Sequence, residues 1–280
     1  MKPVVYDGSF KGFLTTVFEV YEYKILQPEI RRQDAVNGSL FGDVHVVQYD
    51  SEKTKRVLLK LEQKLSKAAM NQLYKSFLSE LPGIENTLLR YVQYIIDSKF
   101  GVENDYGHPD VLAVQQLSKK VHREKHRMEA FVRFQLTGDG LYYAIIQPDY
   151  NVLPLIADHF EKRYADQRWL IYDSRRKYGL YYDLEEVSEV TIDFTATVGE
   201  GKNTIYDEQE GLYQELWKQY FDSVNIKARK NTKLHIQHMP KRYWKYLVEK
   251  QPRYVFYLPA GVILERYASS PGTFGNFIKH

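Results

Sequence analysis

A change of hydrophobic period between residues 109 and 136 constrains the fold more than any other feature of the sequence. Up to Met128, apolar residues recur at the spacing that gathers them on one side of a helix. From residue 131 to residue 136, apolar and polar residues alternate, which is typical of a half-buried strand. The segment therefore predicts a basic helix that runs directly into a strand, so the chain contains both kinds of element.

The sequences before and after this segment differ in character. The first part predicts two short strands at residues 3–7 and 44–49, a polar loop that contains Pro28 and residues 37–39, and helices at 10–24, 50–65, 66–79 and 84–100. The second part predicts helices at residues 151–164 and 208–221, and strands at 131–136, 141–147, 169–173, 178–182 and 187–194. The predicted fold class is α+β, with a helical N-terminal half followed by a mainly antiparallel sheet flanked by helices.

The same pattern predicts the domain organisation. Residues 1–83 are expected to form a helical region with two short strands, and residues 84–250 an α+β domain. Residues 251–280 are expected to form a C-terminal extension.

The composition excludes several classes of protein. Hydrophobic residues make up 44% of the 280 residues, which is enough for a globular core. No apolar run approaches the roughly 20 residues of a membrane span, and the first residues lack a signal-peptide core. A cytoplasmic protein that is not associated with a membrane is therefore expected. There is no cysteine, which excludes disulfides, thiolate metal sites and a cysteine nucleophile. The sequence predicts no cofactor.

The charges are distributed unevenly along the chain. Residues 226–253 hold nine Lys or Arg against one acidic residue, and residues 183–222 hold eleven acidic residues against two Lys. Such asymmetry favours a basic surface for a polyanion and an acidic surface elsewhere. The alternative is that both are ordinary solvated surfaces.

One side of the predicted central helix is strongly basic. At about 100° per residue, Lys119, His122, Arg123 and His126 fall opposite the apolar residues. Arg127 follows Arg123 one turn along, so the two guanidinium groups could hold one anion jointly. Because the arginine fork suits bidentate contacts, we expect Arg123 to meet a phosphate or an internal carboxylate such as that of Asp173.

A second basic segment, residues 229–244, combines cations with aromatic residues. Arg229, Lys233 and Arg242 could neutralise phosphates while Tyr243 and Trp244 stack on bases. This combination suits single-stranded or distorted nucleic acid. The alternative is that the aromatic residues form the packed side of a C-terminal helix whose cations face water.

The histidines allow a hydrolase as an alternative. His122, His126, His159 and Asp173 could act as general acids and bases, or His122 and His126 could bind a metal from one helix face. No third metal ligand is indicated, and Glu124 lies off the ligand face, so no metal is predicted. The sequence has no phosphate-binding glycine loop with its lysine and no Gly-x-Ser-x-Gly motif.

A charged turn follows the predicted strand at residues 169–173. Asp173 could orient Arg175 or Arg176 toward a phosphate or a carboxylate. The alternative is a polar hairpin tip.

Several stretches together resemble one bacterial family. They are YDGSF at 6–10, VHREKHRMEAFVRF at 121–134, RWLIYD at 168–173, YGLYYD at 178–183 and MPKRYW at 239–244. From residue 6 to residue 249 the chain resembles the DNA metabolism proteins that carry the domain of unknown function numbered 4130, with that domain beginning near residue 84. Members are typically encoded beside a radical-SAM protein assigned to DNA modification or repair. In other bacteria the domain is fused to a uracil-DNA glycosylase-like domain.

The resemblance implies DNA, single-stranded or damaged, and a radical-SAM protein as partners, but it assigns no catalytic residues. The expected function is that of a nucleic-acid-binding accessory of a radical-SAM DNA-modification or repair enzyme. The candidate contacts to nucleic acid are Lys119, His122, Arg123, His126, Arg127, Arg133, Arg176, Arg229, Lys233, Arg242, Tyr243 and Trp244.

Overall fold

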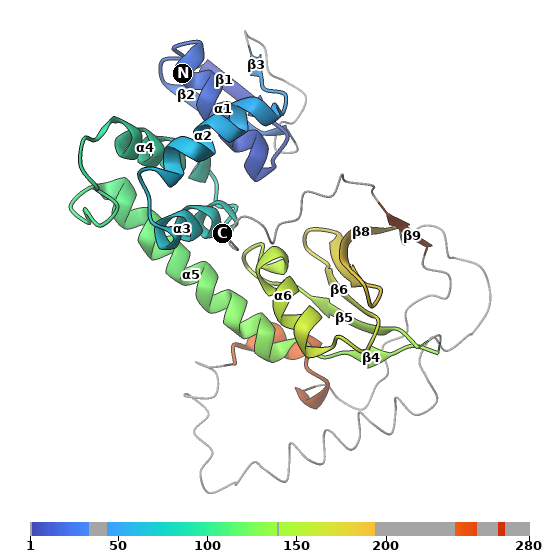
Figure 1. Cartoon of the computed structure of the whole chain (residues 1–280). Coiled ribbons are helices and arrows are strands. Elements are labelled where there is room, and N and C mark those ends of the chain that lie inside the picture. Colours follow the sequence, from blue (N-terminus) through green and yellow to red (C-terminus); the bar gives the residue numbers. More distant parts are fainter. Residues whose placement is uncertain (1, 34–43, 139, 194–238, 251–262, 267–280) are drawn as a thin grey trace, which may run out of the picture. The chain divides into compact units, whose positions relative to one another are not determined.

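The computed structural model describes residues 2–33, 44–138, 140–193, 239–250 and 263–266 (Figure 1). The chain forms two compact units, residues 1–123 and 124–280, and the division falls within helix α5 (Pro109–Phe131). Each unit has its own sheet, and the sheet of the second unit is mostly antiparallel, so the predicted α+β class is confirmed. The domain boundaries predicted from the sequence stay a prediction.

The first unit combines helices with a three-stranded parallel sheet in the order β2-β1-β3. Its strands are β1 (Lys2–Tyr6), β2 (Pro28–Arg32) and β3 (His45–Val46). Its complete helices are α1 (Phe10–Glu22), α2 (Ser51–Glu62), α3 (Lys67–Phe77) and α4 (Ile84–Asp97). Ser9, Asp50 and Ser66 cap the first three helices by accepting hydrogen bonds from backbone N–H groups. All four of these helices were predicted from the sequence.

The loop predicted around Pro28 is wrong, because these residues form strand β2. Ile30 is the one buried residue in the strand, so the sequence shows little of the usual alternation. The backbone N–H of Ile30 donates to Oδ1 of Asn86 on α4 at 3.2 Å. Pairing with β1 and this side-chain contact stabilise a strand whose own sequence signals it weakly.

The second unit is built on a six-stranded sheet in the order β4-β5-β6-β7-β8-β9 (Figure 1). Its strands are β4 (Gln135–Leu136), β5 (Tyr142–Ile146), β6 (Trp169–Asp173), β7 (Tyr178–Tyr182), β8 (Val187–Asp193) and β9 (Ile263–Arg266). Helix α6 (Leu153–Arg163) connects β5 to β6, which run parallel, whereas the other neighbouring strands are antiparallel. The five strands before β9 confirm the predicted sheet.

Strand β6 is the buried centre of this sheet. All five of its residues are buried, and the ring of Trp169 contacts Phe160 of α6, with 6.2 Å between the ring centroids. Phe134 packs against the same two rings at 5.7 and 6.4 Å. This aromatic core packs α6 against the sheet at the Trp169 end of β6.

The strand predicted at residues 131–136 is shorter than expected, because α5 continues to Phe131. The backbone N–H of Val132 still donates to the carbonyl of Met128, at 3.1 Å. The Arg133 guanidinium then donates to the carbonyls of Ala130 and Val132, at 2.7 and 3.2 Å. A cation that satisfies the last carbonyls favours the longer helix over an early strand.

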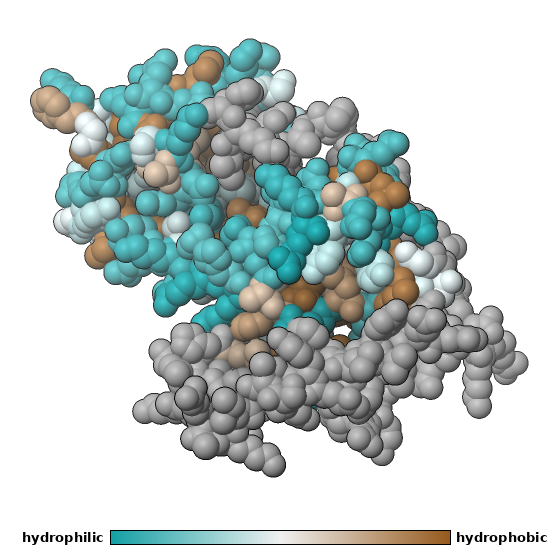
Figure 2. Space-filling model, turned by 60° about the horizontal axis from the view of Figure 1, so that its bottom comes forward, coloured by the Kyte–Doolittle hydropathy of each residue, from teal (hydrophilic) through white to brown (hydrophobic). Residues whose placement is uncertain are grey.

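The surface of the described residues is largely hydrophilic in the view of Figure 2. None of the described helices combines the length and the apolar composition needed to span a bilayer. The helix predicted at residues 208–221 lies outside the described residues.

Gly179 on β7 gives a test of the sheet. A Cβ atom there would lie 2.8 Å from the carbonyl oxygen of Ile171 and 3.2 Å from a methyl group of Leu170. We expect Gly179→Ala to lower the free energy of unfolding by about 1–3 kcal/mol, measured by urea denaturation. Gly101→Ala is the control, because a Cβ atom there meets no described atom within 4 Å. Equal losses in the two variants would contradict the close approach of β6 and β7.

Candidate functional site

The loop after β5 is the centre of the site, and its backbone is held by groups from two other elements. The N–H of Asp149 donates to Oε1 of Glu124 on α5, at 2.9 Å. Its carbonyl accepts from Arg175 at 3.1 Å and from Arg176 at 3.2 Å. Arg176 also donates to the carbonyl of Pro148, at 3.2 Å. The loop backbone is therefore fixed independently of its side chains.

Asp173, at the end of β6, positions one of these arginines. It is fully buried, accepts from the backbone N–H groups of Arg175 and Arg176 at 2.9 and 3.2 Å, and pairs with the Arg176 guanidinium at 2.8 Å. Both of its oxygens therefore have donors, as a buried carboxylate requires. The sequence left open whether Asp173 orients Arg175 or Arg176 toward an anion; in the structure it pairs with Arg176, whose guanidinium meets backbone carbonyls of the loop.

Glu124 joins α5 to the short 3-10 helix η4 (Lys241–Tyr246). Its side chain is 1% exposed. Besides the loop N–H, it accepts from the Tyr243 hydroxyl at 2.5 Å, from Arg242 at 3.1 Å and from Arg127 at 3.5 Å. Burial raises the pKa of Tyr243 above its ordinary value of 10.0, and the adjacent Glu124 carboxylate raises it further. The phenol therefore stays protonated and acts as a donor.

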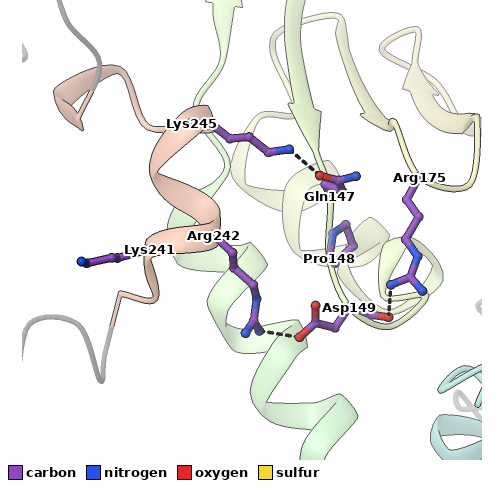
Figure 3. Close-up of a pocket in the computed structure, with 7 residues that line it drawn as sticks. All are labelled: Gln147, Pro148, Asp149, Arg175, Lys241, Arg242 and Lys245. Atoms are coloured by element: carbon purple, nitrogen blue, oxygen red, sulfur yellow. Dashed lines mark hydrogen bonds and ion pairs between the residues drawn. The ribbon is translucent and has the colours of Figure 1, made fainter.

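Residues from three segments surround a cavity of about 550 Å³ (Figure 3). Arg242 and Arg175 approach Asp149 from opposite sides, Lys245 reaches Gln147, and Lys241 points away from the loop. The lining residues are Gln147, Pro148, Asp149, Arg175, Lys241, Arg242 and Lys245. Four of these side chains are cations and one is a carboxylate, so the cavity suits an anionic group. We call it the basic pocket.

Two side chains of the basic pocket hold η4 against the loop. Arg242 pairs with Asp149 at 2.8 Å, and Lys245 donates to Oε1 of Gln147 at 2.5 Å. The Tyr246 hydroxyl lies 3.0 Å from the same Gln147 oxygen. Arg242 and Lys245 are therefore directed to the loop, whereas Lys241 points away from it.

The two aromatic residues predicted to stack on bases, Tyr243 and Trp244, differ in their exposure to solvent. Tyr243 is 2% exposed and Leu247 is fully buried, so these residues form a packed side, which was the alternative to base stacking. Trp244 is partly exposed, and its indole N–H donates to the carbonyl of Met239 at 3.0 Å. Of the two aromatic candidates on η4, Trp244 is the one with an accessible surface.

The predicted basic face of α5 is only partly available to a ligand. Lys119 and Arg123 are exposed, in the first unit. Arg127 turns to Glu124, and Arg133 turns to the end of its own helix. Arg229 and Lys233 lie outside the described residues.

The hydrolase candidates do not form one group. His126 and His159 both approach Glu129, at 3.1 and 3.9 Å. His122 lies 3.3 Å from the Lys75 ammonium, and the buried Asp173 forms a salt bridge with Arg176. Within the part of the chain that the structure describes, no three His, Cys, Asp or Glu side chains are placed to hold a metal ion.

The sequence missed much of the basic pocket. Lys241 and Lys245 flank Arg242 in the basic segment, so their charge was visible, but their place in the lining of one cavity was not. Gln147 and Asp149 follow a strand and belong to no charge pattern. The one signal in the sequence that could have indicated Gln147 and Asp149 was that they lie at, and just after, the end of the predicted strand at residues 141–147.

A comparison with family models finds a match over residues 82–249, which is more than half of the chain. The matching family is described as a domain of unknown function, DUF4130. The chain belongs to this family. Searches of curated proteins and of solved structures find no significant match. Membership of the DUF4130 family was expected from the sequence and is confirmed; it assigns no activity.

Tyr243→Phe tests the contacts of Glu124. Loss of the hydroxyl removes a donor from a buried carboxylate, so we expect the free energy of unfolding to fall by about 1–3 kcal/mol in urea denaturation. Tyr49→Phe is the control, because Tyr49 is 49% exposed. If Tyr243→Phe were no more destabilising than the control, Glu124 would not depend on this hydroxyl.

Proposed function

We propose that this DUF4130 protein binds nucleic acid through phosphate contacts in the basic pocket, as an accessory protein in DNA metabolism. The observation that carries the proposal is a cavity beside the 147–149 loop that is lined by four cationic side chains and one carboxylate. Concave sites of about 300–1,000 Å³ accommodate ligands the size of a nucleotide, and this cavity lies in that range.

The chemistry of the pocket favours phosphate over other anions. Arginine presents a planar fork of donors that matches two phosphate oxygens, and lysine adds a point charge that tolerates several geometries. Trp244 lies on the same short helix as three of these cations and is partly exposed, with the Lys250 ammonium 5.3 Å from its ring centroid. Cations combined with an aromatic face suit single-stranded nucleic acid, in which bases are free to stack.

The hydrolase alternative receives less support from the geometry. Asp173 is fully buried and both of its oxygens are occupied, so it is poorly placed to accept a proton from a substrate. His126 and His159 face Glu129 and are not among the residues that line the basic pocket.

The binding proposal is tested with fluorescently labelled single-stranded, duplex and uracil-containing DNA in anisotropy titrations. We expect binding at low salt, with an affinity that falls steeply as salt rises, by roughly 0.7–0.9 log units per log unit of salt for each phosphate contact. Lys241→Ala combined with Lys245→Ala should weaken binding by about tenfold or more and flatten the salt dependence, because two cations are lost.

The matched control removes two lysines from α2, with Lys55→Ala and Lys60→Ala, both exposed in the structure. This variant has the same net charge as the pocket variant. Absence of binding to all three DNAs at low salt, or an equal loss in both variants, would reject the basic pocket as the binding site.

The radical-SAM protein implied by the family resemblance is the second proposed partner. In the described part of the acidic region 183–222, Glu185 and Glu186 are exposed at the turn between β7 and β8. We expect the two proteins to co-purify after co-expression, and Glu185→Lys with Glu186→Lys to reduce the recovered partner severalfold, because opposite charges favour docking. Recovery unaffected by the reversal would exclude this turn as the docking surface.

A further inference from the structure

Arg242 is the cation of the basic pocket that the structure holds most firmly. Its Nη2 atom donates to Oε2 of Glu124 at 3.1 Å and also contacts the Tyr243 hydroxyl. The centre of the guanidinium lies 4.5 Å from the centroid of the Tyr243 ring. A buried carboxylate and an aromatic ring thus fix the position of Arg242 before any ligand arrives.

The second carboxylate on Arg242 is bound quite differently from the first. The Glu124 side chain is 1% exposed and accepts hydrogen bonds from four residues, so it cannot leave. The Asp149 side chain is 47% exposed and pairs with Arg242 at 2.8 Å. An ion pair that is open to water contributes little to stability, because water and salt screen it.

The carboxylate of Asp149 can move without moving the loop. Its backbone N–H is held by Glu124 and its carbonyl by Arg175 and Arg176. Rotation about the Cα–Cβ bond to another staggered rotamer withdraws the carboxylate and leaves these three contacts intact. Arg242 then keeps Glu124 as its partner, and the donor of its Nη2 atom that met Asp149 becomes available to a ligand.

We propose that the Asp149 carboxylate occupies a phosphate subsite in the free protein, and that an incoming phosphate group displaces it from Arg242. The proposal rests on the proposed function and specifies the site at which the phosphate binds. Carboxylate and phosphate oxygens accept the same charge-assisted hydrogen bonds from arginine, so one can replace the other. Asp149 is thus a built-in competitor that lowers the affinity of the basic pocket for phosphate.

The test replaces Asp149 by Asn, which preserves the size of the side chain and removes its charge. We expect Asp149→Asn to bind single-stranded DNA about three- to tenfold more tightly than the unmodified protein in anisotropy titrations. The salt dependence should also become steeper, because the pocket has lost an internal anion that neutralised one of its cations.

Asp166→Asn is the matched control. Asp166 is exposed in the same unit, outside the residues that line the basic pocket. The substitution Asp166→Asn makes the same chemical change as Asp149→Asn, and we expect it to alter the affinity for DNA by less than twofold. An affinity of Asp149→Asn equal to or lower than that of the unmodified protein would overturn the proposal, and a lower affinity would make Asp149 a positioning residue for Arg242.

A second variant and a second probe separate this inference from the proposed function. In Asp149→Asn combined with Arg242→Ala, the gain in affinity should disappear; a gain that persists would show that it does not arise at Arg242.

Inorganic pyrophosphate, titrated by calorimetry, tests the subsite without DNA. If the unmodified protein binds no DNA, tighter binding of pyrophosphate by Asp149→Asn would still support the subsite. Absence of pyrophosphate binding in both proteins would then overturn it.

Discussion

The burial of one carboxylate, that of Glu124, determines how the second unit assembles its site. A charged carboxylate is expensive to remove from water unless donors surround it, and the cost is recovered only when those donors are in place. The donors to Glu124 come from its own helix α5, from the loop after β5 and from η4. Segments far apart in the sequence must therefore meet at one point for the charge to be satisfied.

The first unit uses the same combination of residue types. Glu85 of α4 is 6% exposed, accepts from the Tyr6 hydroxyl at 3.1 Å and pairs with Arg32 at 3.0 Å. The Arg32 guanidinium also lies 5.1 Å from the centroid of the Phe77 ring. In each unit a helical glutamate thus ties a tyrosine and an arginine from distant segments to its helix. Such networks fix the position of the arginines that they engage, because some of the guanidinium donors are directed to an internal carboxylate.

This internal use of charge explains which parts of the structure could be predicted. The amphipathic helices and the strands β5 to β8 follow from local periodicity, which directly reflects burial on one side. Strand β2 could not be found, since Ile30 is its one buried residue and its position depends on pairing with β1. The end of α5 was misplaced because Arg133 contacts the last carbonyls, an interaction that hydrophobic periodicity does not record.

The candidate site was harder to predict than the fold for the same reason. A helical projection treats Arg123 and Arg127 as near equivalents, yet Arg123 is exposed and Arg127 turns to Glu124. Asp173 was expected to orient an arginine, and it does, because the two groups are close in the sequence. The pairing of Arg242 with Glu124 and Asp149 spans about a hundred residues and leaves no local pattern.

The distinction between exposed and anchored cations also bears on how the protein would discriminate among anions. Exposed side chains such as Lys119 attract any polyanion, but each must lose its conformational freedom when it binds. The guanidinium of Arg242 is held by Glu124 before a ligand is present, so less freedom remains to be lost on binding. A guanidinium in a fixed position binds more tightly an anion whose oxygens match the spacing of its donors. The affinity of a mobile ammonium depends mainly on the charge of the anion. The buried carboxylate therefore does more than stabilise the fold: it converts one arginine of a basic segment into a group with a defined direction.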